Sequence, residues 1–449
     1  MSTTTLELQR LTRTPQTNSS EQEWDGISTQ RARDNEASPP AEAVSSIPDG
    51  GLSAWNTLIA SSIFTFWFNG INNSWGVMQA ALLNEGLTST STLSFVGSLA
   101  MACTVIFSLL AVRFMRFAGA RNAALLGITM LGVGQLTAGY TTNNIAGLFG
   151  TAGLLYGTGS SLCFMVASIL PSQFFSSKLG LANGLIKFAG GIGGFVLSIA
   201  LNKSIINVGT AWTFRILGIS CLVTGIPVAF LVKELNPPRG NASFFDFSLF
   251  RNWEFIFIFL AASIGVFALY VPPYFLPLFA QSLRLSSTTG AYLAAGFNLC
   301  AAFGRLGSGI LCDRIGAVNT FLLASFLNAL SMFAIWPFSN MLPTLSIFAV
   351  INGIANGAFF VTLPTVVTQI YGPARTGVAM GMTITGWSFG YFLGAPIASY
   401  LLQAAGGVTE GSISSYRPAI FYAGGVALLS TAFVLIARLR LNPKLLKRV

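Results

Sequence analysis

Three positively charged side chains, Lys187, Arg215 and Arg305, interrupt stretches that are otherwise apolar enough to lie in a membrane. A charge inside a bilayer is costly unless water, a partner or a ligand compensates it. The chain has no histidine, and its 14 Asp and Glu residues fall outside the middle of the apolar stretches. These charges therefore predict binding of an organic anion or of carbonyl dipoles, and not acid–base catalysis.

Arg305 is the deepest of the three charges. It lies seven residues after Asn298, so both side chains share one face of a predicted helix over 288–311. A polar stripe of this kind faces away from lipid. We therefore predict that Arg305 points into the bundle and not towards lipid. Arg215 lies near a helix end beside Trp212, which is typical of a structural anchor at the membrane surface.

Lys187 has two interpretations. It lies about six residues, or roughly 9 Å, inside a predicted helix over 180–201, so its long stem can reach the membrane surface. It also lies among small residues that let helices approach closely, on a helix that we expect to border the interior. Surface snorkelling and anion binding both remain open for this lysine.

Pairs of polar residues one helical turn apart occur in three further predicted helices. Each pair alone is compatible with plain helix packing, but together they predict a wet interior, to which Tyr156, Trp387 and Tyr391 would add aromatic walls. Pro272 and Pro273 would also break their helix, as in mobile transporter helices. The candidate substrate-binding residues are Arg305, Lys187, Asn298, Asn69, Asn73, Tyr270, Tyr274, Asn352 and Asn356.

The elements that carry these residues are membrane helices. The 449 residues are 53% hydrophobic and 8% charged, with a mean hydropathy of +0.67. A bilayer core of about 30 Å needs roughly 20 apolar residues per helix, and continuous runs of that length favour helices over barrel strands. The sequence predicts an all-α membrane protein with twelve transmembrane helices, near 55–78, 91–112, 122–141, 146–170, 180–201, 211–232, 254–281, 288–311, 317–337, 342–370, 376–403 and 417–437.

The longest polar connection between these helices divides them into six and six, the plan of transporters whose solute site lies between two halves. With both termini inside, the inner loops and C-terminal tail hold 14 Lys and Arg and the outer loops hold three, which satisfies the positive-inside rule. The predicted parts are a disordered cytoplasmic tail (1–48), an N-terminal half (49–232), a cytoplasmic linker (233–252), a C-terminal half (253–437) and a basic tail (438–449).

The N-terminal tail differs in composition from the rest of the chain. Residues 1–48 contain four Arg and seven Asp or Glu and are rich in Ser and Thr, so we expect a disordered segment. Two interpretations of this tail remain open, a solvated linker and a phosphorylated trafficking or degradation tail. The basic residues elsewhere follow a membrane face and form no single patch, so we expect no nucleic-acid partner.

Three segments resemble one known family. They are "DGGLSAW" (49–55), "FFSSKLGLANGL" (174–185) and "GRLGSGILCDRIG" (304–316), and they are similar to the monocarboxylate-porter branch of the major facilitator superfamily, in its fungal form. The resemblance implies a solute transporter with alternating access, in which Arg305 meets a substrate carboxylate. Animal members carry a lysine where Asn73 stands and an acid where Ala301 stands, so the resemblance does not extend to lactate-type proton symport.

The last of these segments also contains the candidate gate. An Asp at a helix end followed by Arg and Gly at a tight turn can pair with a neighbouring helix end, so Asp313 and Arg314 are predicted to latch one state of the bundle. A turn with a topogenic charge is the alternative.

The predicted function is export of an organic acid or secondary metabolite across the plasma membrane by a monomer. Uptake of a small monocarboxylate is the alternative, and a non-transporting solute sensor is the alternative from another class. The expected partners are a small, anionic organic solute and the lipid bilayer. We expect no catalytic residue, no cofactor and no metal, because the chain has no histidine and its cysteines have no metal-ligand spacing.

Overall fold

The computed structural model describes residues 50–175, 179–235, 246–407 and 413–442. All the helices described below belong to one unit, Pro48–Val449. The predicted disordered tail (1–48), the middle of the predicted linker (236–245) and the end of the basic tail (443–449) lie outside the described residues.

The first six crossings are α-helical, as predicted. The first crossing is a single helix, the second bends by 51° at Phe107, and the fourth includes a π-helical turn before Tyr156. Neither irregularity follows from hydrophobic periodicity. The elements are α2 (Leu52–Asn84), α3 (Thr90–Ile106) with α4 (Ser108–Ala118), α5 (Ala120–Ala138), α6 (Ile145–Leu148) with η1 (Phe149–Leu155), α7 (Tyr156–Ile169) and α8 (Pro171–Phe174), and α9 (Leu179–Phe230), which holds two crossings.

The second six crossings repeat this plan. The seventh crossing is broken at Tyr270, next to Pro272 and Pro273, which confirms the predicted break. The elements are η2 (Phe247–Arg251), α10 (Trp253–Leu269) with α11 (Val271–Ser282), α12 (Ser287–Ile315), α13 (Ala317–Ala334) with η3 (Trp336–Phe338), α14 (Leu342–Ala404), which again holds two crossings, and η4 (Ser414–Tyr416) with α15 (Arg417–Leu441).

Two of these helices are too long for one crossing. The 52 residues of α9 and the 63 residues of α14 would extend about 78 and 95 Å if straight, against a bilayer core of about 30 Å. Within the described residues, six helical segments are long and apolar enough to span a membrane by themselves, or seven if the bent α3–α4 pair is one span. Counting α9 and α14 twice and joining the broken pairs gives the predicted twelve crossings.

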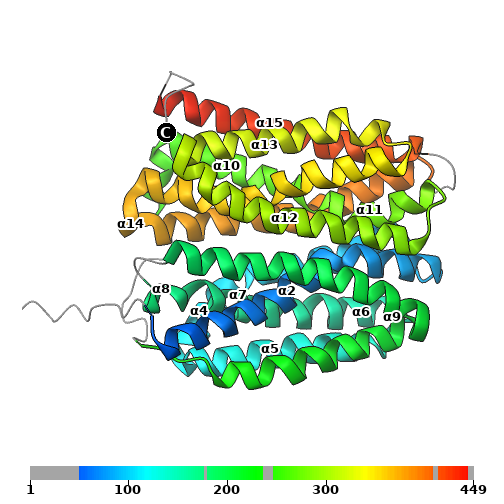
Figure 1. Cartoon of the computed structure of the whole chain (residues 1–449), viewed down its shortest axis with the longest axis horizontal. Helices are drawn as coiled ribbons and strands as arrows, with labels where there is room; N and C mark the ends of the chain where they lie inside the picture. Colours follow the sequence, from blue (N-terminus) through cyan, green and yellow to red (C-terminus); the bar gives the residue numbers. More distant parts are fainter. Residues whose placement is uncertain (1–49, 176–178, 236–245, 408–412, 443–449) are drawn as a thin grey trace, which may run out of the picture. The chain divides into compact units, whose positions relative to one another are not determined.

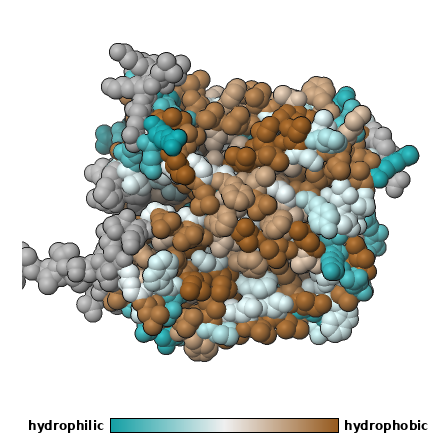
Figure 2. Space-filling model, viewed as in Figure 1, coloured by the Kyte–Doolittle hydropathy of each residue, from teal (hydrophilic) through white to brown (hydrophobic). Residues whose placement is uncertain are grey.

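The twelve crossings run side by side, and an even number returns the chain to the end at which it started. Figure 1 shows the beginning of α2 and the end of α15 at the same side of the bundle. We call this side of the bundle the terminal end, and Leu52 and Leu441 mark it. We call the opposite side the far end, and Asn84 and Ser287 mark it. On the face seen in Figure 2, apolar residues cover the middle and polar residues gather towards the two ends, as a membrane-embedded bundle requires.

Small residues set the distance between the helices of the interior. A Cβ atom on Gly190, Gly191 or Gly194 of α9 would lie within 3.0 Å of Asn69, Ala302 or Asn298. A Cβ atom on Gly193 would overlap the carbonyl oxygen of Phe66. The predicted packing role of the glycines around Lys187 is therefore confirmed, because α9 touches both α2 and α12 through them.

Gly209 makes the turn between the two crossings of α9. Its φ of 81° and ψ of 172° lie in a region that is open almost only to glycine. A Cβ atom built there meets no atom within 4 Å, so the constraint comes from the backbone alone.

We therefore expect Gly209→Ala to destabilise the protein by about 1–3 kcal/mol, measured by thermal unfolding of the purified protein. Gly296→Ala is the matched control, because Gly296 lies inside α12 and a Cβ atom there also meets nothing within 4 Å. The control should be neutral or slightly stabilising. Equal melting temperatures for the two variants would contradict the assignment of this turn.

Candidate functional site

Arg305 lies inside the bundle and has few partners. Its side chain is 6% exposed, and one guanidinium nitrogen donates a 2.6 Å hydrogen bond to the backbone carbonyl of Lys187 on α9. Its Nε is buried without a hydrogen-bond partner. Within the described residues no carboxylate forms an ion pair with it. An arginine charge placed in this way is stabilised by backbone and aromatic groups and retains unused donor capacity.

Lys187 lies beside Arg305. The lysine side chain is half-buried, and its backbone carbonyl is the group that accepts the hydrogen bond from Arg305. Two neighbouring cations repel each other, so an anion close to both would be strongly favoured. The structure brings together the two predicted charges, one from each half of the bundle.

Three of the predicted asparagines form a chain next to these charges. Asn298 of α12 is 1% exposed, and its amide donates to the backbone carbonyl of Asn73 on α2 at 3.3 Å. Asn73 in turn donates to the side-chain oxygen of Asn69 at 3.2 Å. Asn69 is half-buried, so the chain leads from the contact between the two halves to a side chain with accessible surface.

Five aromatic residues next to Arg305 contact one another, and we call them the aromatic cluster: Tyr270, Tyr274, Phe360, Trp387 and Tyr391. The ring centroid of Tyr270 lies 6.0 Å from that of Tyr274 and 5.3 Å from that of Tyr391. The ring centroid of Trp387 lies 6.1 Å from that of Tyr391 and 5.9 Å from that of Phe360. The Arg305 guanidinium is 5.9 Å from the Phe360 ring centre, within cation–π range.

Of these five residues, Tyr270 and Tyr274 are predicted as site residues and Trp387 and Tyr391 as aromatic walls. Phe360 was missed, because a phenylalanine in an apolar helix carries no signal that separates it from lipid-facing residues. Arg305 meets the cluster through Phe360, and ring contacts connect Phe360 to Trp387 and Trp387 to Tyr391, so the cluster and the charge form one site.

Asn356 has a specific structural role at the edge of this site. Its amide donates a 2.7 Å hydrogen bond to the backbone carbonyl of Leu269. In an unbroken helix that carbonyl would accept from residue 273, which is a proline and has no N–H. Asn356 on α14 therefore caps the broken end of α10.

Removal of this amide should leave a buried carbonyl without a partner. We expect Asn356→Ala to lower the free energy of unfolding by about 1–3 kcal/mol. Pro273→Ala would restore a backbone donor, so the double variant should lose less stability than the sum of the single losses. Additive losses in denaturant or thermal unfolding would show that Asn356 does not serve the helix break.

Asn352 lies elsewhere. It is fully buried, and its amide donates to the side chains of Asn328 and Ser331 on α13 at 2.7 and 2.8 Å. These bonds join α13 to α14, so within the described residues Asn352 is a packing residue and is not grouped with Arg305.

The candidate gate residues lie at the terminal end. Asp313 and Arg314 are both exposed in the last turn of α12. The described part of the chain provides neither an ion pair nor a side-chain hydrogen bond for them. In the state seen here these two residues do not latch the described helices, and their gating role remains a prediction.

The hydrogen bonds between the two halves instead lie towards the far end. Ser94 of α3 hydrogen-bonds Ser399 of α14 at 2.5 Å, and Ser91 donates to Gln403 at 2.9 Å. Gly76 of α2 packs against the backbone of Pro273 and Tyr274. Within the described residues, the hydrogen bonds between the halves lie from the level of Arg305 to the far end, so this structure is closed at the far end.

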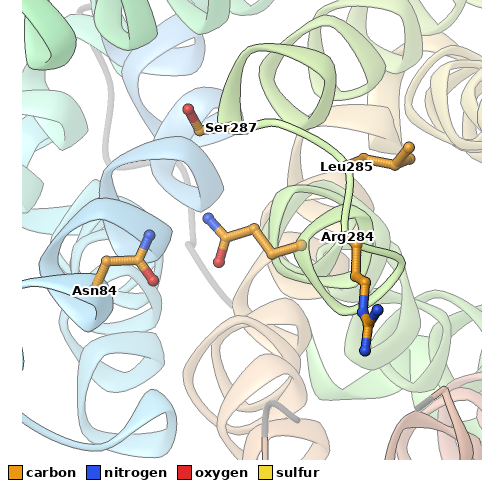
Figure 3. A pocket seen from close by; sticks show the side chains of 5 residues that line it. Asn84, Arg284, Leu285 and Ser287 are labelled. Carbon is orange, nitrogen blue, oxygen red and sulfur yellow. The ribbon is translucent and has the colours of Figure 1, made fainter. Parts of the chain in front are cut away.

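A pocket of about 550 Å³ opens at the far end, where α2 meets α11 and α12. Figure 3 shows Asn84 on one side of it and Arg284 and Leu285 on the other. The pocket is lined by Asn84, Gln281, Arg284, Leu285 and Ser287. None of the predicted site residues lines it, so it lies beyond the closure and apart from Arg305.

Twelve crossings in two halves with charged and aromatic residues between them define a membrane transporter. The sequence pattern of the Major Facilitator Superfamily matches residues 56–307 and 258–448, so the chain belongs to this superfamily. It is 27% identical over 412 residues to MFS transporter asaE of Aspergillus flavus, covering 90% of this chain and 91% of that one. It is also 27% identical over 403 residues to the agnestins efflux protein AgnL12 of Paecilomyces divaricatus, covering 87% and 88%.

The fold is also that of solved transporters. A mutant of the nucleoside transporter NupG superposes with a TM-score of 0.69 at 14% identity, covering 86% of this chain and all of that one. The D-xylose–proton symporter superposes with a TM-score of 0.65 at 13% identity, covering 85% and 97%. At these identities the likeness shows the fold alone.

Proposed function

We propose that this transporter exports an organic acid, and that the acid binds between the halves at Arg305. The observation that carries the proposal is the buried guanidinium, which has an unpaired Nε and no carboxylate partner within the described residues. An acidic solute would neutralise it, and Lys187 would add to the attraction. We propose transport without a catalysed reaction, by a chain that acts as a monomer.

Export is favoured over uptake by the relatives. AgnL12 is described as an efflux protein for agnestins, and apdF of Emericella nidulans, 26% identical over 397 residues, as an efflux protein for aspyridones. By similarity, the solute of this chain is a secondary metabolite. The segments at 49–55, 174–185 and 304–316 further support a place in the monocarboxylate-porter-like branch.

Flux measurements test this proposal. Liposomes that contain the purified protein and are preloaded with labelled naphthalene-2-carboxylate should release it faster than protein-free liposomes. An Arg305→Ala protein reconstituted at equal density should release it at the background rate. Release at the background rate by the wild-type protein would favour the sensor alternative and would argue against transport of this class of solute.

We also propose that the protein lies in the plasma membrane with both termini in the cytoplasm, which makes the far end extracellular. The excess of basic residues in loops at the terminal end supports this orientation. A C-terminal epitope tag should be inaccessible to antibody on intact cells and accessible after permeabilisation. Staining of intact cells would reverse the orientation.

A further inference from the structure

The aromatic cluster and the neighbouring Arg305 contain buried polar atoms that find no hydrogen-bond partner among the residues that the structure describes. Arg305 Nε, Trp387 Nε1 and Tyr274 Oη are all buried without a hydrogen-bond partner. A buried donor without a partner is costly, and a group of them next to one another calls for an explanation. The two N–H groups can only donate, so whatever satisfies them must present acceptors.

The rings of the cluster stand nearly at right angles to one another. The interplanar angle is 75° for Tyr270 and Tyr391, 79° for Trp387 and Tyr391, and 84° for Phe360 and Trp387. A planar ligand ring in such a corner can stack on one side chain and meet the edge of another, which are the two favourable aromatic geometries. A saturated ring of equal size would gain only from burial.

All these groups come from the second half of the bundle, from α11, α12 and α14 and from Tyr270 at the break between α10 and α11. The first half contributes Lys187 and the half-buried Asn69. The acid-binding groups and the aromatic walls are therefore adjacent, with the guanidinium next to Phe360.

We propose that this site selects a planar conjugated ring that carries an anionic oxygen group, with the ring against the aromatic cluster and the oxygens at Arg305. The proposal rests on the proposed transport of an organic acid and narrows its substrate class. Flat, conjugated acids should bind and saturated acids of the same size should bind poorly.

Trp336 provides a matched control for Trp387. It is also buried, and its Nε1 also has no hydrogen-bond partner in the described part of the chain. However, it stacks on Phe348 at 4.5 Å and contacts Phe279, and it lies in η3 outside the aromatic cluster. If removal of any buried indole weakened binding, substitution of Trp336 and of Trp387 would lower the affinity equally.

Binding can be measured by titration calorimetry on the purified protein in detergent, with three probes of the same carbon skeleton. Naphthalene-2-carboxylate has the planar ring and the acid. Decahydronaphthalene-2-carboxylate keeps the acid without the planar ring, and naphthalene-2-carboxamide keeps the ring without the charge. Because each aromatic contact is worth about twofold to tenfold in affinity, we expect the first probe to bind at least tenfold more tightly than either of the others.

Trp387→Phe keeps a ring and deletes the donor, and should weaken binding of naphthalene-2-carboxylate about tenfold, whereas Trp336→Phe should leave it unchanged. Equal affinity of the wild-type protein for the planar and the saturated acid would overturn the proposal, even if the Trp387 variant does not fold. An equal loss in both tryptophan variants would also overturn it. Binding with the expected preference but without flux would instead contradict transport and leave the selectivity intact.

Discussion

Arg305→Ala should reduce transport of an organic acid by a factor of about 100 or more. A hydrogen bond to a buried charged group contributes up to about 3 kcal/mol, and each 1.4 kcal/mol is tenfold. Arg305→Lys keeps the charge but loses the planar fork of donors, so we expect a loss of about tenfold. The measurement is initial efflux from proteoliposomes with equal amounts of inserted protein.

Two further variants make this result interpretable. Arg215→Ala is the control, since Arg215 lies near the far end, stacked on Tyr140 and Trp212 at 4.1 and 4.8 Å, and should affect stability more than transport. Lys187→Met keeps the length of the stem and deletes the charge. Normal transport by Lys187→Met would assign the lysine to snorkelling and leave the arginine alone at the substrate. Transport of the organic acid at the wild-type rate by both Arg305→Ala and Lys187→Met would contradict the anion site. The substrate would then be better explained as a neutral solute that asparagines and aromatic rings hold.

Gly76→Val should nearly abolish transport by preventing closure of the far end. A Cβ atom at Gly76 would overlap the carbonyl of Pro273 and lie 2.9 Å from the Cα of Tyr274. These are backbone atoms that cannot move aside locally, so the two halves must separate there, at a cost of about 1–3 kcal/mol or more. The state that is closed at the far end would then be depopulated.

The altered state can be detected without transport. In Gly76→Val, a cysteine introduced at Ser91 should react faster with a membrane-impermeant maleimide added at the far end, because the Ser91–Gln403 contact would open. Gly184→Ala is the control, since the nearest atom to its Cβ would be a side-chain carbon of Leu306 at 3.9 Å. Unchanged labelling and unchanged transport in Gly76→Val would show that this contact does not close the bundle.

The number and order of the helices could be predicted from the sequence, because twenty-residue apolar runs have few alternative structures. The charged site residues could also be predicted, because a lysine or an arginine inside an apolar run is conspicuous. Asn69 and Asn73 were recognisable as a pair because residues four apart on a helix always meet, and they do form a hydrogen bond.

The partners of these residues could not be predicted, because they depend on which helix faces which. Asn352 and Asn356 look alike in the sequence, one turn apart on one helix. In the structure one is bonded to α13 and the other caps the break in α10. Arg305 bonds a backbone carbonyl on α9, a group that every residue has and that no side-chain pattern reveals. The bend at Phe107 and the π-helical turn before Tyr156 likewise leave no mark on the hydrophobic periodicity of their helices.

Counterflow in proteoliposomes tests alternating access at the Arg305 site most directly. Liposomes loaded with unlabelled naphthalene-2-carboxylate and diluted into a trace of the labelled acid should take up the label transiently above its equilibrium level, because a carrier exchanges solute across one site that faces each side in turn. Arg305→Ala liposomes should show no such overshoot. Simple equilibration without an overshoot in the wild-type protein, at a concentration of acid that the protein is shown to bind, would contradict the account.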